Sequence, residues 1–526
     1  METKQNGCAV NVDDDLLWYM YESELGDVSD FEGTIREYVR GYADKGVSDL
    51  LFNVFCQVSA IPTKALTFWG DKYYQKTENG CDVDYTKEHH VKHIVDIYGA
   101  MKRNPFAALI EQTRAFGMRP WISIRMNDCH CGADKTSRLH GDLFYEAVKN
   151  GWVVGDDLAG AYYGRCFDYG VKEVRDRMFA YITEVLDLLD TDGLELDFQR
   201  EMFCFNYKKD PDCHKIMNDF MRKVRAYADK KGAERGHKIA ICVHLPRDIA
   251  YDRVFGFDAE TWVKERLVDV LVPSSRWENT DSDMPIAAWK RLVAGTDIQI
   301  WAGLEAFLAY PYPNTPETLR GFAAQYLDEG ADKMYLYNHF RYRARNIEHS
   351  EEEAAAAGLD ADYPAGLTSD AVDRRFATAW RVCSRAEEAK KGVCRHVVTF
   401  MEKRMAPAGA ERYLPFPMAV DGESRFAMKT GDLSGAACVL YLGVREGSAP
   451  AVTVDGKAAA PLGEAADAYP QTRTVAKMPG WKGYDDALGT TYYAYAIAPG
   501  AGNERKLTFR GAVTVMYAEI KAIFPE

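Results

Sequence analysis

The sequence lacks the features that mark membrane proteins and nucleic-acid-binding proteins. Its 526 residues contain no window of 18 uninterrupted apolar residues, so we expect no membrane span. The 65 lysines and arginines are outnumbered by 79 aspartates and glutamates, and the net charge of −14 repels phosphate backbones, which speaks against a nucleic-acid partner. Repeats of solenoid length are also absent. With 47% hydrophobic residues, the sequence indicates a compact soluble protein.

The first ten residues, METKQNGCAV, lack the charged and then apolar pattern of a secretory leader. We therefore expect a cytoplasmic protein or, if a leader was removed, a periplasmic or secreted one. The 12 cysteines are scattered, and many lie in apolar stretches, as do Cys56, Cys242 and Cys438. In a chain of this length that pattern favours buried thiols in a reducing compartment over a disulfide framework.

Short apolar runs alternate with amphipathic stretches in a regular order, which predicts parallel strands joined by helices. The expected strands cover residues 8–12, 48–55, 119–126, 192–198, 238–246, 268–274, 298–307 and 332–340. Eight such units predict an α/β protein, a (β/α)8 TIM barrel with long insertions. Further on, short alternating runs separated by turn residues predict an antiparallel β-sandwich. The predicted domains are a catalytic barrel over residues 1–390 and a β-sandwich over residues 391–526.

The active site of a TIM barrel lies where the strands end and the βα loops begin, so polar residues at those ends are the candidates for function. In chain order they are Asp13, Asp14, Asp15, Arg125, Asn127, Asp128, His130, Glu195, Asp197, Gln199, Arg200, Glu201, His244, Arg247, Glu305, Asn338, His339 and Arg341.

The segment DGLELDFQRE places three polar side chains at alternate positions, which directs Glu195, Asp197 and Gln199 to the barrel interior. A buried carboxylate needs partners. For Glu195 a structural ion-pair layer and a functional role therefore remain equally open, whereas the position of Asp197 nearer the strand end favours function. The segment resembles the DGxDxDxE strand of the chitinase superfamily. Gln199 stands at the final acid, however, and a neutral amide cannot donate the catalytic proton.

The loop RMNDCHCG contains Asp128 and His130 two residues apart, close enough for the carboxylate to orient the imidazole and hold its proton. Such a pair can act as a general acid near neutral pH. The CHC motif in the same loop and the segment EHHVKH, residues 88–93, raise a zinc alternative, but neither spacing matches a zinc motif. We expect no metal and no cofactor.

Arg125 and Arg200 follow neighbouring strands and concentrate positive charge at the mouth of an acidic protein. Because guanidinium groups bind planar carboxylates with two hydrogen bonds, this predicts an anionic small substrate; the alternative is that both arginines neutralise rim carboxylates. Aromatic residues near the rim can stack on sugar faces. They are Trp69, Tyr162, Tyr163, Trp277, Tyr310 and Tyr312.

Five short motifs together resemble the inverting exo-sialidases of glycoside hydrolase family 156. They are NVDDD after the first strand, IRMNDCH, LDFQR, GFDAETWVKERLVDVLVPS and YNHF. The resemblance covers roughly residues 8–390 and implies a catalytic aspartate after the first strand and a catalytic histidine after the third. By position these are Asp13 or Asp14, and His130 with Asp128 beside it.

The same resemblance places the contacts to the sialic-acid carboxylate and ring on Arg125, Arg200 and Asn338. It implies that one group protonates the leaving oxygen while another activates water on the opposite face. We assign the acid to His130 and the base to the aspartate, and the reverse assignment stays open. The expected partner is a sialylated glycan, and the sequence leaves a homodimer open.

Asp197, His244 and Glu305 are further substrate-binding candidates because they lie toward the C-terminal ends of the fourth, fifth and seventh predicted strands. Three other hypotheses remain. The first is a glycosidase for another sugar that uses a carboxyl pair, Asp197 or Glu201 with Glu305. The second is a non-catalytic sugar-binding barrel, motivated by Gln199. The third is a zinc hydrolase.

Overall fold

The computed structural model describes most of the chain. The described residues are 7–13, 30–160, 162–276, 279–309, 312–339, 377–399, 403–405, 411–413, 415–472 and 489–525. Asp14, Asp15, Trp277, Tyr310 and Arg341 lie outside them. Within the described ranges, no helix is both long enough and apolar enough to cross a membrane.

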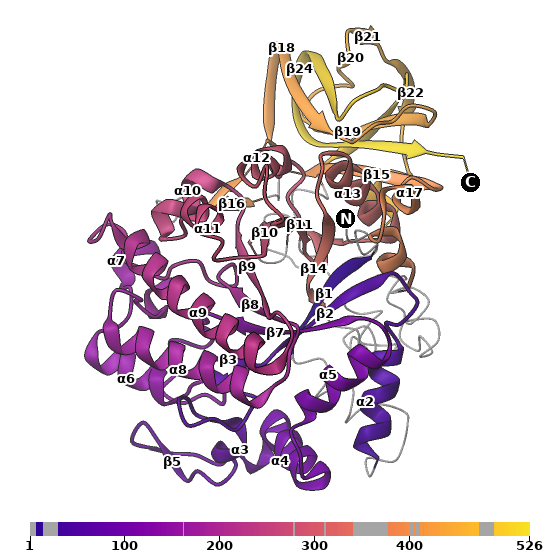
Figure 1. Cartoon of the computed structure of the whole chain (residues 1–526). Coiled ribbons are helices and arrows are strands. Elements are labelled where there is room, and N and C mark those ends of the chain that lie inside the picture. The colour runs from indigo at the N-terminus through magenta and orange to yellow at the C-terminus, as the bar shows by residue number, and fades with distance from the viewer. Residues whose placement is uncertain are drawn as a thin grey trace.

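Eight parallel strands close into a barrel, which confirms the predicted TIM barrel (Figure 1). They are β1 (Cys8–Val12), β2 (Val47–Asn53), β7 (Arg119–Arg125), β8 (Gly193–Asp197), β9 (Ala240–Pro246), β10 (Val270–Ser274), β11 (Gln299–Leu304) and β14 (Lys333–His339). Neighbours in sequence are neighbours in the barrel, and β14 closes it by pairing with β1.

Helices surround the barrel and begin at local capping signals. The helix α5 (Pro105–Ala115) has proline in its first turn after the N-cap Asn104, and α13 (Pro316–Asp328) starts with a capping box at Thr315. The other long helices are α2 (Phe31–Arg40), α4 (His89–Met101), α6 (Asp142–Asn150), α8 (Lys172–Leu188), α9 (Cys213–Arg235), α10 (Ile249–Phe255), α11 (Ala259–Lys264) and α12 (Ile286–Leu292). Short helices are α3 (Trp69–Lys72), α7 (Asp156–Ala159), α17 (Ala386–Ala389), η1 (Tyr85–Lys87), η2 (Tyr163–Arg165) and η3 (Tyr469–Thr472).

Polar groups inside the barrel are joined across strands. At the N-terminal end, the Nζ of Lys333 contacts the Asp49 carboxylate, which also accepts a hydrogen bond from the indole of Trp121 at 2.9 Å. Trp121 in turn packs edge-on against Trp301, with 5.5 Å between ring centroids. The N-terminal end of the barrel interior is therefore filled by paired polar groups and packed indole rings.

The chain after the barrel forms the predicted antiparallel β domain. Its main strands are β15 (Val393–Thr399), β18 (Met418–Lys429), β19 (Ala437–Arg445), β20 (Ala451–Val454), β22 (Ala460–Glu464), β23 (Thr491–Ile497) and β24 (Glu504–Ile523). The long β24 joins them, since it pairs with β18 and β20 in its first part and with β15 and β19 in its second. Minor strands are β3 (Phe55–Cys56), β4 (Val58–Ser59), β5 (Thr77–Glu78), β6 (Cys81–Asp82), β12 (Phe307–Ala309), β13 (Tyr312–Pro313), β16 (Lys403–Met405), β17 (Glu411–Tyr413) and β21 (Lys457–Ala458).

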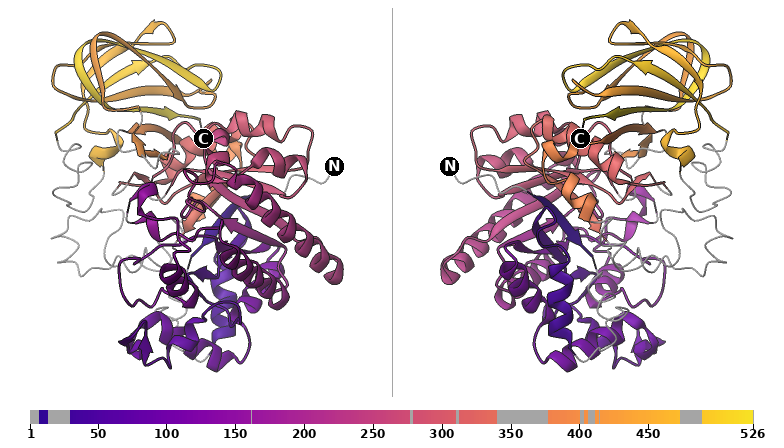
Figure 2. Two further views of the ribbon diagram at one scale, coloured as in Figure 1. Left: turned by 90° about the vertical axis from the view of Figure 1, so that its left-hand side faces the viewer. Right: turned by 90° about the vertical axis from the view of Figure 1, so that its right-hand side faces the viewer.

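This β domain packs on the side of the barrel that carries α13 (Figure 2). A Cβ on Gly321 of α13 would lie 2.2 Å from the carbonyl oxygen of Arg395, so helix and sheet approach too closely there for any side chain. Lys429 of β18 also pairs with Glu329 at 3.1 Å. The boundary at residue 390 stays a prediction, and β15 begins three residues later.

Candidate functional site

The candidate site lies at the C-terminal ends of the barrel strands, above a second buried polar layer. In that layer Glu195 accepts hydrogen bonds from Asn11 and Tyr335, both at 2.6 Å. Burial, together with the nearby charge of Asp197, raises the pKa of Glu195 to about 7. Its partners are all internal to the barrel, so Glu195 belongs to the framework beneath the site.

Asp197 occupies the next layer and supports the loop that carries Arg200. Its carboxylate accepts hydrogen bonds from Nδ1 of His244 (2.9 Å) and the Tyr337 hydroxyl (2.6 Å). It also accepts from the backbone N–H groups of Gln199 (3.0 Å) and Arg200 (3.1 Å). Burial opposes ionisation of Asp197, but His244 and these hydrogen bonds outweigh it and lower the pKa. Asp197 and His244 are both inaccessible to solvent.

Gln199 holds this loop from its other side, because its amide donates to the carbonyl of Ser274 at 3.2 Å. The amide at this position thus makes a structural hydrogen bond between the loops that follow β8 and β10.

Arg125, the last residue of β7, is buried and ties three strand ends together. Its Nη2 donates to Oδ2 of Asp13 at 2.7 Å and to Oδ1 of Asn338 at 3.0 Å. Asn53, at the end of β2, donates to the other oxygen of Asp13 at 2.9 Å. Asp13 keeps 13% of its side chain exposed. The guanidinium and the partly exposed carboxylate are therefore fixed at the mouth before any ligand arrives.

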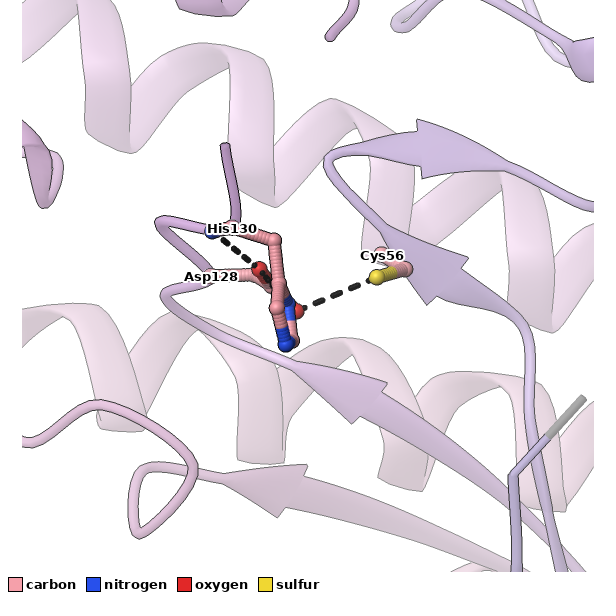
Figure 3. Close-up of side chains that lie close together, drawn as sticks. All are labelled: Cys56, Asp128 and His130. Atoms are coloured by element: carbon pink, nitrogen blue, oxygen red, sulfur yellow. Dashed lines mark hydrogen bonds and ion pairs between the residues drawn. The ribbon is translucent and has the colours of Figure 1, made fainter. Parts of the chain in front are cut away.

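Asp128, His130 and Cys56 form a compact group (Figure 3). The Arg125 guanidinium lies 3.6 Å from the Asp128 carboxylate. Oδ1 of Asp128 accepts from the backbone N–H of His130 (2.9 Å) and lies 2.6 Å from its Nδ1, while Oδ2 accepts from the Cys56 thiol at 3.1 Å. Burial and the charge of Asp128 raise the pKa of Cys56 well above its ordinary value, so sulfur keeps its proton. Burial would raise the pKa of Asp128, yet His130 and the two arginines hold it well below the usual range.

The contacts of His130 define its tautomer. Its Nε2 contacts Nη2 of Arg200, and a guanidinium can only donate hydrogen bonds, so Nε2 is the accepting nitrogen. The proton then lies on Nδ1 and points to Asp128. With 29% of its side chain exposed, His130 is the accessible member of the group. In this arrangement the Arg200 guanidinium covers Nε2, the ring nitrogen of His130 that would otherwise face a substrate.

Cys56, Asp128 and His130 also carry potential metal ligands, with donor atoms within 4.8 Å of one another among the residues that the structure describes. The Cys56 thiol donates to Asp128, and the two imidazole nitrogens of His130 contact Asp128 and Arg200, so a cation would have to displace these contacts. The Arg125 guanidinium also lies 3.7 Å from the Cys56 sulfur. In the CHC motif, Cys129 is buried and Cys131 is exposed, so the two thiols lie in different environments.

The remaining predicted residues are placed as follows. Asp14 lies outside the described residues, so its role stays a prediction. Glu305 follows β11 with a buried side chain, and its carbonyl accepts a hydrogen bond from Asn314 at 2.8 Å. Its predicted contact with substrate is likewise untested. Asn127 is structural, since its amide group bonds Phe167 and Phe203 of the flanking loops.

Sequence reasoning missed four residues that contact this site: Asn53, Cys56, Arg276 and Tyr337. Asn53 lies near the end of the predicted strand 48–55, a position that could have identified it, whereas Cys56 resembles the other thiols in apolar stretches. Tyr337 could have been found, because it alternates with Tyr335 on β14 in the same period-two pattern that identified Glu195 and Asp197.

No protein-family model and no curated protein matches this sequence. Among solved structures, the glycoside hydrolase domain of PgaB (BpsB) from Bordetella bronchiseptica is 12% identical, with 67% of this chain and 98% of that chain covered and a TM-score of 0.40. The GH36 alpha-galactosidase AgaB from Geobacillus stearothermophilus is 10% identical, with 99% of this chain and 56% of that chain covered and a TM-score of 0.33. This chain thus spans little more than half the length of that alpha-galactosidase. These values are too low to transfer a substrate or a mechanism, and the TIM-barrel assignment rests on the closed parallel barrel itself.

Proposed function

We propose that the protein is a glycoside hydrolase, specifically an inverting exo-sialidase that releases terminal sialic acid from glycans. One observation carries the proposal. Two buried arginines, Arg125 and Arg200, meet a partly exposed histidine and a partly exposed aspartate at the C-terminal end of the barrel. An anionic sugar needs such a fixed cationic receptor, and hydrolysis needs one proton donor and one acceptor beside it.

The contact between Arg200 and His130 suits a substrate whose carboxylate is attached to the reacting carbon. Sialosides carry their carboxylate on the anomeric carbon, next to the leaving oxygen. When that carboxylate binds the guanidinium of Arg200, Nε2 of His130 loses its donor and becomes free to take a proton. Substrate binding would therefore generate the acid at the place where the leaving oxygen arrives.

In the proposed reaction the Nε2–H of His130 passes to the leaving oxygen as the bond to the anomeric carbon breaks. Asp128 keeps Nδ1–H in place and balances the imidazolium that precedes this step. Asp13 accepts a proton from water, whose oxygen attacks the opposite face of the sugar and inverts its configuration. Arg125 and Asn338 hold the ring and its carboxylate. We propose that Asp197 and His244, which solvent does not reach, position the Arg200 loop instead of contacting the sugar.

A carboxyl-pair glycosidase is the competing candidate, and Glu201 already has internal partners. It accepts a hydrogen bond from the Tyr162 hydroxyl at 3.0 Å and pairs with Arg276 at 3.2 Å. The Glu201 side chain has no exposed surface, whereas Asp13 keeps 13% and His130 keeps 29% of the side chain exposed, so a substrate reaches the latter two more readily.

The test is hydrolysis of α-linked aryl sialosides between pH 5 and pH 8 by the unaltered protein and by His130→Ala, Asp13→Asn, Asp14→Asn and Glu305→Gln. We expect turnover that disappears with His130 and with one of the two aspartates but survives Glu305→Gln. Proton NMR of the first product anomer then reports inversion. An unaltered protein that leaves sialosides intact but hydrolyses neutral glycosides, with activity lost in Glu305→Gln, would refute the proposal.

A further inference from the structure

A second polar cluster lies beside the proposed catalytic group and takes no part in the mechanism above. It consists of Glu201 from the loop after β8, Arg276 from the loop after β10, and Tyr162 and Tyr163 at the short helix η2. All of these loops leave the C-terminal end of the barrel or extend from it.

The Tyr162 side chain is anchored at its tip and open along its ring. Its hydroxyl donates to the buried carboxylate of Glu201 at 3.0 Å, whereas 45% of the residue is exposed to solvent. The Arg276 guanidinium lies over the two tyrosine rings, 5.2 Å from the centroid of Tyr163 and 5.9 Å from that of Tyr162. The two rings are nearly perpendicular, at 88°, with centroids 5.1 Å apart. The orientation of the Tyr162 ring is therefore fixed, although the ring is not buried as an ordered aromatic side chain usually is.

An exposed aromatic ring held by a buried acid is a poor way to stabilise a fold. Most of the stabilisation from an aromatic side chain comes from burying its surface, and here nearly half of that surface stays in water. Ordering the ring in advance instead lowers the entropy lost when a ligand stacks on it. Of the other aromatic residues predicted for sugar stacking, Trp69 and Tyr312 are buried, which removes their rings from any ligand at the surface.

The cluster adjoins the group that would protonate the leaving oxygen. Glu201 follows Arg200, whose guanidinium contacts Nε2 of His130. The Tyr162 hydroxyl also contacts the thiol of Cys129, the residue before His130. Tyr162 is therefore joined both to the loop that carries Arg200 and to the loop that carries His130.

We propose that Tyr162, held by Glu201 and Arg276, is the binding platform for the leaving-group sugar, and that this sugar is a neutral hexopyranoside. The inference rests on the proposed function, since it identifies the other half of the glycan that the enzyme cleaves. A neutral sugar fits because the Arg276 charge is already balanced by the Glu201 carboxylate. The apolar face of a pyranose would stack on the ring, while its hydroxyls reach the Arg276 guanidinium, which keeps 11% of its side chain exposed.

The experiment compares a substrate that has the second sugar with one that lacks it. Hydrolysis of sialyllactose and of methyl α-sialoside is measured for the unaltered protein, Tyr162→Ala and Tyr162→Phe, with Tyr74→Ala as the matched control. Tyr74 is 71% exposed on the segment after α3, so its removal deletes another exposed tyrosine ring elsewhere on the molecule. We expect Tyr162→Ala to lower kcat/KM for sialyllactose about tenfold and for methyl α-sialoside less than twofold. Tyr162→Phe should lie between Tyr162→Ala and the unaltered protein, because the ring stays but loses its anchor.

Equal losses on both substrates, or no loss on either, would overturn the platform. A second measurement separates this outcome from failure of the sialidase proposal: saturation-transfer NMR of free lactose with the unaltered protein and with Tyr162→Ala. If neither sialoside is cleaved but lactose saturates only when Tyr162 is present, the sugar platform stands and the sialidase assignment falls. Absence of lactose saturation in the unaltered protein, together with equal sialoside kinetics, refutes the platform alone.

Discussion

Replacing Asp128 by asparagine removes the charge that fixes His130 while preserving the size of the side chain. The carboxylate accepts from Nδ1 of His130 at 2.6 Å and lies 3.6 Å from the guanidinium of Arg125. In Asp128→Asn an amide NH2 would face Arg125 and the Cys56 thiol, which are both donors. The hydrogen bonds from Nδ1 of His130 and from the Cys56 thiol would both lose their charged acceptor; at about 1.5–3 kcal/mol for each such bond, the two amount to about 3–6 kcal/mol. At about 1.4 kcal/mol per tenfold change, kcat should fall by two to four powers of ten.

The assay is initial-rate hydrolysis of an aryl sialoside, with circular dichroism to verify that Asp128→Asn is folded. Cys56→Ser is the matched control, because a serine hydroxyl can donate to the same carboxylate oxygen, and we expect its kcat within about tenfold of the unaltered protein. Long-range 1H–15N NMR of the His130 ring reports the Nδ1–H tautomer in the unaltered protein and its loss in Asp128→Asn. A folded Asp128→Asn protein with kcat within fivefold of the original and an unchanged tautomer would refute the reasoning.

Three further predictions concern pH, proton uptake and metal. The Glu195 pKa is raised from 4.5 to about 7 in the folded protein, so the folded state keeps a proton that the unfolded chain loses. The free energy of unfolding should therefore fall by up to about 3 kcal/mol as the pH rises from 4.5 to about 7. Urea titrations of Glu195→Gln should lack this fall of the unfolding free energy with pH. Calorimetry of sialic-acid binding in two buffers should show proton uptake by the unaltered protein and none by His130→Ala. Equal uptake by the two proteins would contradict the proposal that the ligand carboxylate draws Arg200 away from Nε2 of His130. Dialysis against EDTA should leave turnover unchanged, and a loss that zinc restores would reinstate the metal hypothesis.

The sequence predicted the barrel accurately because each strand is a short apolar run bounded by helix signals. The expected strand at 119–126 is observed as Arg119–Arg125, and 8–12 as Cys8–Val12. The seventh strand was predicted too long: β11 ends at Leu304, and Phe307–Ala309 pairs with β13 in a hairpin outside the barrel. Both segments are apolar, so composition does not separate them.

Sequence reasoning identified residues of the candidate site that are both polar and located at the C-terminal end of a strand, as Arg125, Asp128 and His130 are. It missed residues whose contacts join positions far apart in the chain. Cys56 and Asp128 are separated by 72 positions, and nothing in the local pattern distinguishes this thiol from the other free thiols. Arg276 was missed for the same reason, since its partner Glu201 lies 75 residues earlier.

The last barrel strand determines when the site can exist. Alternate residues of β14 each satisfy an acid placed earlier in the chain: Lys333 contacts Asp49, Tyr335 donates to Glu195, and Tyr337 donates to Asp197. A chain that ends before β14 would have to bury these three carboxylates without those donors, which is costly. During synthesis, closure of the barrel and assembly of the site should therefore be a single late event. A truncated form that ends before residue 333 should expose its apolar strands and bind no sugar.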